Sequence, residues 1–322
     1  MFCFSLKSLR AVTSEDQFDL SLFVSPAQCQ PSMVRVGVVG YGNLGQYLVE
    51  NIERLPGLEL AWVWNRNKSS LRGRVAEDLI LSSLSDCGEK SPDVIVEVAH
   101  PDITRSQLDI SHLTRPQCWY FREFGAKFLS VADFMMGSPT ALADPEVETM
   151  LKVAAVSHGV YIPSGALWGG EDIRKMAERG TLTGLTVTMR KHPASFKLEG
   201  ELRQRNDSVL SSAEVLYHGP VRQLCPLAPN NVNTVSPTVT SCSQSWTFIQ
   251  MAAAAVAATN LGFDKTVGRL VSDPSIPNWH VVEVMTHNSH HLRVESDISC
   301  AGGGGGPGGA RGREVPSEDI SQ

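Results

Sequence analysis

Three glycines near the start of the chain have the spacing that a dinucleotide-binding turn requires. Gly40, Gly42 and Gly45 fit the pattern G-x-G-x-x-G and follow a run of valines. In such a turn the first glycine makes the bend, the second lets the backbone approach a pyrophosphate, and the third lets helix and strand pack closely. A helix beginning near Asn43 and Leu44 would direct its free N–H groups toward the anion. A glycine turn in a domain that binds no nucleotide is the alternative.

The residues around this turn predict a strand, a helix and a second strand. The β-branched run 34–39 is typical of a buried parallel strand. An apolar stripe at helical spacing follows the turn, and it consists of Leu44, Leu48, Ile52 and Leu55. Pro56 and Gly57 end the helix, and a second apolar run covers 58–64. This order predicts a nucleotide-binding βαβ unit.

The end of the second predicted strand bears on the choice of cofactor. An NAD site usually has an acidic residue there, which accepts a hydrogen bond from the ribose 2′-hydroxyl. Here Asn65 and Arg66 occupy the place. Asn65 does not repel a 2′-phosphate, and Arg66 can bind one in a forked, charge-assisted contact. The pair favours NADP, or acceptance of both NADP and NAD, although Arg66 also fits a solvated loop.

A third buried parallel strand is predicted over 94–99. It ends at His100 and Pro101. Ligands in a doubly wound sheet lie outside the carboxyl ends of the strands, so we expect Ala99 and His100 near the nicotinamide half of a cofactor. A structural cap on the strand end is the alternative for His100.

Composition restricts the class of protein. A chain of 322 residues is long enough for two domains with separate cores. The net charge of −6 argues against nucleic-acid binding. The seven cysteines form no C-x-x-C pair, which favours reduced thiols in the cytoplasm and gives no metal site. No apolar run reaches the roughly 18 residues of a membrane span.

The chain divides into four predicted parts. Residues 1–32 are expected to be a disordered extension, with Met33 where a natural start would be, and 33–160 a dinucleotide-binding α/β domain. From Leu182 to Arg190 the alternation of threonines with apolar residues predicts an antiparallel strand with one wet face. It opens the mixed sheet of a second domain over 161–299. The glycine-rich tail 300–322 is expected to be disordered. Further helices are predicted at 124–129, from 145 up to Gly159, which ends it, from 171, and at 251–260. Further strands are predicted at 133–136, 160–162, 267–271 and 280–285.

Four motifs together resemble the L-aspartate dehydrogenase family. They are the glycine turn, then Pro163-Ser164-Gly165-Ala166, Pro229-Asn230-Asn231-Val232-Asn233, and Asp273-Pro274 leading to Asn278-Trp279-His280. The resemblance covers about 34–285. It implies a Rossmann domain with a smaller α+β catalytic domain, and a homodimer. It also implies oxidation of L-aspartate with NAD(P)+ to iminoaspartate, which gives oxaloacetate and ammonia or feeds NAD biosynthesis.

The resemblance also assigns residues. His280 matches the family's active-site histidine, and Ala166 and Asn233 match cofactor contacts. An imidazole near neutral pKa can exchange the protons of the amine, although a buried structural histidine is the alternative. We expect Asp273 and Asn278 to orient this ring. Two substrate carboxylates need cations, for which Arg190 and Lys191 are the candidates, with a solvated strand end as the competing interpretation.

Three departures from the family pattern keep a second function open. Segments 105–121 and 235–250 look inserted, and the family's closing strands and helix are missing after Met285. The competing hypothesis is a protein that binds NAD(P) without turnover. A sugar-type oxidoreductase would need a Glu-Lys-Pro signature, which the residues from Val98 to Pro101 do not supply. His287, His290 and His291 lie in polar flanks and do not predict a metal site.

Overall fold

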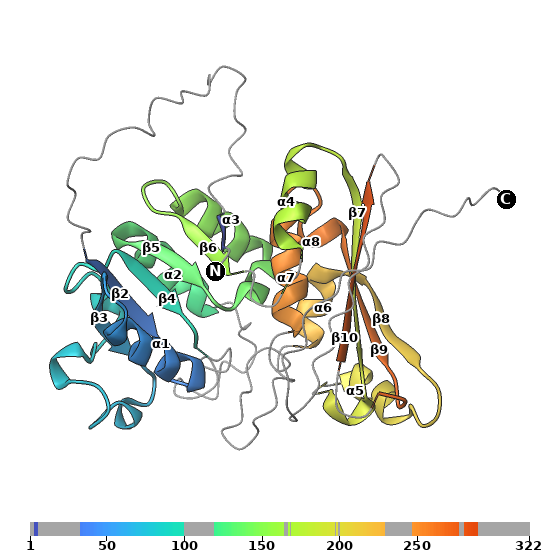
Figure 1. Cartoon of the computed structure of the whole chain (residues 1–322), viewed down its shortest axis with the longest axis horizontal. Helices are drawn as coiled ribbons and strands as arrows, with labels where there is room; N and C mark the ends of the chain where they lie inside the picture. The colour runs from blue at the N-terminus through green and yellow to red at the C-terminus, as the bar shows by residue number, and fades with distance from the viewer. Residues whose placement is uncertain are drawn as a thin grey trace.

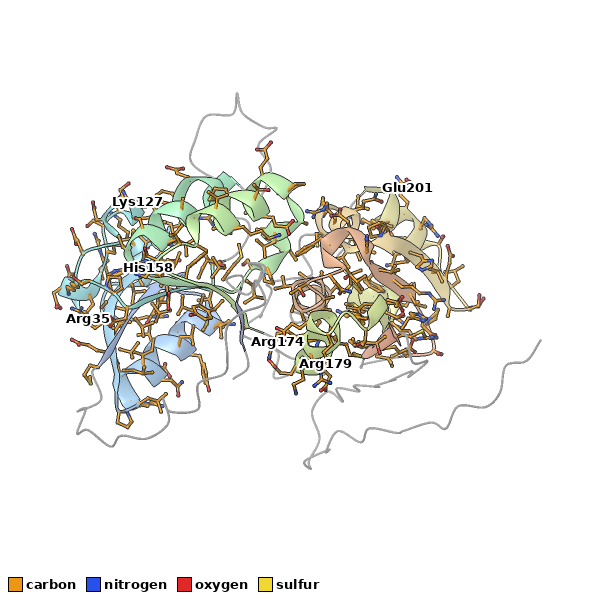
Figure 2. The ribbon with its side chains drawn as sticks, turned by 90° about the horizontal axis from the view of Figure 1, so that it is seen from above. Arg35, Lys127, His158, Arg174, Arg179 and Glu201 are labelled. Carbon is orange, nitrogen blue, oxygen red and sulfur yellow. The ribbon has the colours of Figure 1, made fainter. Side chains whose placement is uncertain are left out.

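The computed structural model has two sheet-based domains that share one hydrophobic core (Figure 1). Figure 2 views them side by side from above, with Arg35 and Lys127 on the first and Glu201 on the second. The structure describes residues 3–5, 33–99, 119–163, 167, 169–196, 198, 200–228, 247–276 and 280–288, of which 3–5, 119–122, 247–249, 280 and 288 by backbone alone.

The first domain is built on a six-stranded sheet in the order β1-β6-β5-β4-β2-β3. Its strands are β1 (Cys3–Ser5), β2 (Val34–Val39), β3 (Leu58–Trp64), β4 (Val94–Glu97), β5 (Asp133–Met136) and β6 (Val160–Pro163). All neighbouring pairs are parallel except β1 with β6. The predicted parallel strands are therefore confirmed, and the strand order reverses between β2 and β4, where a doubly wound sheet binds its ligand.

Helices of the first domain connect these strands. They are α1 (Asn43–Arg54), α2 (Trp119–Val131) and α3 (Pro145–Ala154), with short 3-10 helices at Lys68–Ser70, Glu77–Leu79, Leu84–Asp86 and Pro139–Ala143. The buried face of α1 consists of Gly45, Val49 and Ile52, whereas Leu44 and Leu55 are 40% and 52% exposed. The predicted stripe is thus shifted, because Gly45 packs directly on the strand below it.

Three boundaries expected from the sequence differ from the structure. Cys3–Ser5 pair with Tyr161–Pro163, so these three residues belong to the sheet and not to a disordered extension. Strand β6 runs from Val160 to Pro163, so the first sheet crosses the expected boundary at 160. Helix α2 begins at Trp119 and takes in the end of the segment 105–121.

The second domain contains a mixed four-stranded sheet in the order β10-β7-β9-β8. Its strands are β7 (Leu182–Lys191), β8 (Glu214–Pro220), β9 (Thr266–Ser272) and β10 (His280–Asn288). β7 is antiparallel to β10, as predicted, and parallel to β9. A parallel neighbour needs a long crossover, and the chain between β7 and β9 supplies it.

Helices stand between the two sheets, and the other face of the second sheet is turned away from them (Figure 1). They are α4 (Gly170–Glu178), α6 (Val221–Leu227), α7 (Thr247–Ala257) and α8 (Gly262–Lys265), while α5 (Gly200–Asp207) lies at one end of the sheet. The alanines of α7 are buried and bring its backbone close to both domains, since α7 contacts β6, β7 and β9.

The sequence did not reveal the elements over 200–227, namely α5, β8 and α6. Helix α6 contains a proline, Pro226, in its last turn. α7 was expected over 251–260 and covers Thr247–Ala257 instead. Among the described residues, no helix is long and apolar enough to cross a membrane.

Candidate functional site

The glycine turn between β2 and α1 leaves no room for side chains at two of its three glycines. Gly40 has φ +105, and a Cβ there would lie 2.7 Å from Ala99 Cα and N. A Cβ on Gly45 would lie 2.1 Å from the carbonyl oxygen of Gly40. These positions therefore require glycine, because β2, β4 and α1 meet there at backbone contact.

The middle glycine has the opposite surroundings. Gly42 is the N-cap of α1 with φ −74, and among the described residues a Cβ there would have no atom within 4 Å. In the described part of the chain no side chain caps the helix, and Gly42, Asn43 and Leu44 are exposed. An open space in front of the first N–H groups of a twelve-residue helix fits a pyrophosphate.

Asn65 ties the end of β3 to this turn. Its Oδ1 accepts a hydrogen bond from the Tyr41 N–H (3.3 Å), and its Nδ2 donates to Ser70 Oγ (2.8 Å) and to the Asn67 carbonyl (3.2 Å). Both ends of the amide are therefore used inside the protein. Arg66, which follows, is exposed. Of the two residues expected near the adenosine ribose, Asn65 holds the glycine turn to the end of β3 by hydrogen bonds, and Arg66 is exposed to solvent.

A buried carboxyl that the sequence analysis did not single out lies at the end of β4. Glu97 is 2% exposed. Its Oε1 accepts from the Ala99 N–H (2.8 Å) and from Ser138 Oγ (3.2 Å), and its Oε2 accepts from the Ser138 N–H (3.1 Å). Burial raises its pKa to about 7, against the lowering effect of these donors. The sequence feature that could have indicated this site is an acidic residue inside the apolar run 94–99.

In the second domain, backbone pairing brings together three polar positions of one sheet face. Lys191 pairs with His280 on β10 and with Ser272 on β9. Paired positions lie on the same face of a sheet, and here it is the face that turns to the helices, with Met189 and Leu270. Lys191 is 1% exposed, and its Nζ lies 6.0 Å from the centroid of the Phe196 ring. The interpretation of Lys191 as a solvated strand end is wrong.

A hydrogen-bonded pair fixes the chain around Lys191. Ser272 Oγ donates to Asn206 Oδ1 (2.8 Å), and Asn206 Nδ2 donates to the Pro193 carbonyl (2.9 Å). The Asp273 N–H donates to the Lys191 carbonyl (2.7 Å). Helix α5, which carries Asn206, thereby holds the ends of β7 and β9 together.

Arg190 lies on the opposite face of the same strand. Its Nη1 lies 3.2 Å from Asp273 Oδ2, and its Nη2 lies 3.9 Å from Glu283. Asp273 also accepts hydrogen bonds from the Ser275 hydroxyl (2.6 Å) and N–H (2.9 Å). The bond from the hydroxyl is the largest cause of the lowered pKa of Asp273, and the Ser275 N–H and Arg190 lower it further. The described partners of Asp273 are thus Arg190 and Ser275, and the expected contact with the His280 ring lies outside the described side chains.

Several expected site residues lie outside the described residues. They are His100, Ala166, Asn233 and Asn278, and of His280 the structure gives the backbone only. Within the described ranges, no group of three His, Cys, Asp or Glu side chains is arranged to hold a metal ion.

A parallel sheet with a glycine turn at its switch point, joined to a mixed four-stranded sheet, defines a Rossmann-type dinucleotide-binding fold with a C-terminal α+β domain. The solved aspartate dehydrogenase of Thermotoga maritima has this fold, with a TM-score of 0.55 at 17% identity over 83% of this chain and 89% of that one.

Sequence comparisons narrow the class to a family. Residues 172–243 match the family model for the C-terminal domain of aspartate dehydrogenase. The aspartate dehydrogenase domain-containing protein of Xenopus tropicalis is 53% identical over 78% of this chain and 78% of its own length. The L-aspartate dehydrogenase of Methanococcoides burtonii is 25% identical over 83% and 85%. The chain belongs to the aspartate dehydrogenase family, as its motifs predicted.

Proposed function

We propose that this protein is a nicotinamide-dependent dehydrogenase that oxidises L-aspartate at its α-carbon. The products are iminoaspartate, the reduced cofactor and a proton, and water then converts the imine to oxaloacetate and ammonia. The pairing of His280 with Lys191 is the observation that carries the proposal. It puts the family's catalytic histidine position on one sheet face with a buried cation.

The first domain would hold the cofactor. The turn formed by Gly40, Gly42, Asn43, Leu44 and Gly45 presents the N–H groups of α1 to the pyrophosphate. Arg66 would bind a 2′-phosphate, so the proposed cofactor is NADP or NAD. Ala99, His100, Ala166 and Asn233 stay proposed contacts on its nicotinamide half. When bound, the nicotinamide supplies the acceptor for the hydride of the aspartate α-carbon.

The second domain would hold the substrate. His280 is proposed to take a proton from the substrate amine and return it during hydration of the imine. Lys191 is proposed to bind one substrate carboxylate, because a cation in surroundings of low dielectric attracts a carboxylate strongly. Arg190 and Lys191 were equal candidates from sequence. The ion pair of Arg190 with Asp273 gives it a different role, holding the loop that leads to His280.

We also propose a homodimer that forms through the outer face of the second sheet. Among the described elements no helix covers this face (Figure 1). Val281, Glu283 and Met285 lie on it and are half-buried within the single chain. Light scattering of the purified chain should give twice its mass. The predicted compartment stays the cytoplasm.

The decisive experiment is reduction of NAD+ and NADP+ by the full chain with L-aspartate, and with D-aspartate, L-glutamate and L-asparagine as controls. We expect turnover with L-aspartate, slowed when its α-hydrogen is replaced by deuterium, because the α-carbon hydride is the group transferred. Turnover with another amino acid alone would overturn the substrate. Cofactor binding without any turnover would favour the competing binding-only function.

A further inference from the structure

Glu97 lies at the end of β4, beside the point where the strand order of the sheet reverses. It is the last residue of β4 and pairs with Val39, the last residue of β2, on one side and with Met136 on the other. The strand order reverses between β2 and β4. Two residues later, Ala99 packs against Gly40 of the glycine turn. A charge on Glu97 therefore acts at the crevice in which a doubly wound sheet binds its ligand.

Among the described residues, the carboxyl group has hydrogen-bond donors around it and makes no ion pair. Its three bonds come from the Ala99 N–H and from the N–H and hydroxyl of Ser138. The paired positions on β2 and β5 are apolar, and the main influences on the pKa of Glu97 are its burial and its hydrogen-bond donors. His100, the titratable residue nearest in sequence, lies outside the described residues.

The site can accommodate both protonation states. The carboxylate accepts all three bonds as they stand. In the neutral acid, the new O–H can donate to Ser138 Oγ, 3.2 Å away, and the Ser138 hydroxyl can turn to the Ala99 carbonyl, 3.5 Å away. The burial that holds the pKa of Glu97 at about 7 leaves both states populated near neutral pH. A positive charge placed in the crevice would favour the carboxylate.

The two forms of a nicotinamide cofactor differ by one such charge, since the oxidised ring is cationic and the reduced ring is neutral. We propose that Glu97 makes the site selective for the oxidation state of the cofactor, binding NAD(P)+ as the carboxylate and NAD(P)H as the neutral acid. Binding of NAD(P)+ then releases the Glu97 proton to solvent, and reduction of the ring takes one back. This inference rests on the cofactor half of the proposed function and is independent of the amino-acid substrate.

The test is calorimetric titration of the full chain with NAD(P)+ and NAD(P)H, in two buffers of different ionisation enthalpy at each of several pH values. The difference between buffers counts the protons released or taken up. We expect about half a proton released per NAD(P)+ at pH 7, because a group with pKa near 7 is half protonated there. NAD(P)H should instead take up about half a proton, because it binds with Glu97 in the neutral form. From pH 6 to 8 the affinity for NAD(P)+ should rise several-fold, while that for NAD(P)H does not.

Variants assign the proton to its group. Glu97→Gln should remove the proton release and the pH dependence, whereas Glu89→Gln, on an exposed residue, should change neither. Ser138→Ala removes a donor to the carboxylate and should move the midpoint of proton release upward by about one pH unit. It also carries the test if Glu97→Gln does not fold.

The same proton release for both cofactor forms in the wild type would overturn the inference, and so would release that persists in Glu97→Gln. Absence of cofactor binding would overturn it together with the proposed function. Proton release without aspartate turnover would support the inference and contradict the proposed substrate alone.

Discussion

His280 stands opposite Lys191 at the first pair of the antiparallel ladder between β10 and β7. The pairing puts position 280 on the helix-facing side of the sheet, where Lys191 is buried, and puts Arg190 on the other side with Asp273. Sequence proximity thus groups Arg190 with Lys191, but strand geometry separates them, because neighbouring residues of a strand point to opposite faces.

The first prediction concerns the cation on the His280 face. Lys191→Met should raise KM for aspartate by about 10- to 150-fold, since a hydrogen bond to a charged group contributes about 1.5–3 kcal/mol. Steady-state kinetics measure this change in KM, and urea denaturation of the same preparation checks that the variant is folded.

Arg190→Met is the matched control on the other face. It should leave KM within about a factor of two and lower the free energy of unfolding by about 1 kcal/mol, the value typical of a partly buried ion pair. A KM effect at Arg190 larger than that at Lys191 would contradict the assignment of the substrate cation.

The second prediction concerns His280. If this residue exchanges protons with the amine and the attacking water, His280→Ala should lower kcat by about 10²–10⁴-fold with little change in cofactor affinity. The wild-type rate should fall at acid pH as an imidazole becomes protonated, which in peptides happens near pH 6.5. A pH–rate profile at saturating aspartate measures both. If the mutant keeps the wild-type rate and the same fall in rate at acid pH, His280 is a packing residue and takes no part in catalysis.

Most of the first domain could be predicted because its signals are local. A valine run, a glycine turn and an apolar run follow one another between Val34 and Trp64, and strands buried on both faces are continuously apolar. The exposure of Leu44 could not be predicted in this way. The face of α1 that turns inward is set by the close contact of Gly45 with the Gly40 carbonyl. This contact between the helix and the turn before it is a property of the fold.

The site depends more on non-local pairing, and there the sequence was less informative. The burial of Lys191 follows from its pairing with His280 and Ser272, which are far along the chain. The role of Glu97 could not be predicted from the sequence, because the donors to its carboxyl group, the N–H groups of Ala99 and Ser138, are brought to it only by the fold. Helix α5 has a polar sequence with little periodicity, so its packing and not its pattern defines it.

The third prediction contrasts two glycines of one turn. Gly42→Val should abolish binding of either cofactor and leave stability nearly unchanged, because its Cβ meets no described atom and its φ of −74 suits any residue. Gly45→Ala should instead destabilise the fold, since its Cβ would lie 2.1 Å from a carbonyl oxygen. Cofactor titration and thermal unfolding separate the two effects. Retained affinity in Gly42→Val would place the nucleotide elsewhere.

The fourth prediction concerns cofactor choice. We expect NADP(H) to bind at least as tightly as NAD(H), and Arg66→Ala to weaken NADP(H) selectively. The loss should be about 10- to 150-fold, because a forked contact with the 2′-phosphate contributes about 1.5–3 kcal/mol. Fluorescence titration with the reduced cofactors measures it. Equal losses for both cofactors would mean that Arg66 contacts a group they share.

The last prediction concerns a contact that joins the two domains. Arg222 of α6 donates to the carbonyl of Ala143 (2.8 Å) and to Glu148 (2.9 Å) in the first domain. It also binds Asp264 through Nε and Nη2 (2.6 and 2.9 Å) and lies over the Phe263 ring. The hydrogen bond to Asp264 is the largest cause that raises the pKa of the Arg222 guanidinium, and Glu148 raises it further. The side chain therefore stays charged.

Arg222→Met should lower the free energy of unfolding by about 3 kcal/mol, because it removes the hydrogen-bond donor of Asp264, of Glu148 Oε2 and of the Ala143 carbonyl. Arg174 also bridges two carboxylates, Glu171 and Glu178, but all three belong to α4 and are partly exposed (Figure 2). Arg174→Met should therefore cost less than about 1 kcal/mol. Urea denaturation compares the two variants, and Arg222→Met should also broaden the transition as the domains uncouple. Equal small losses would show that the shared apolar core, and not Arg222, holds the domains together.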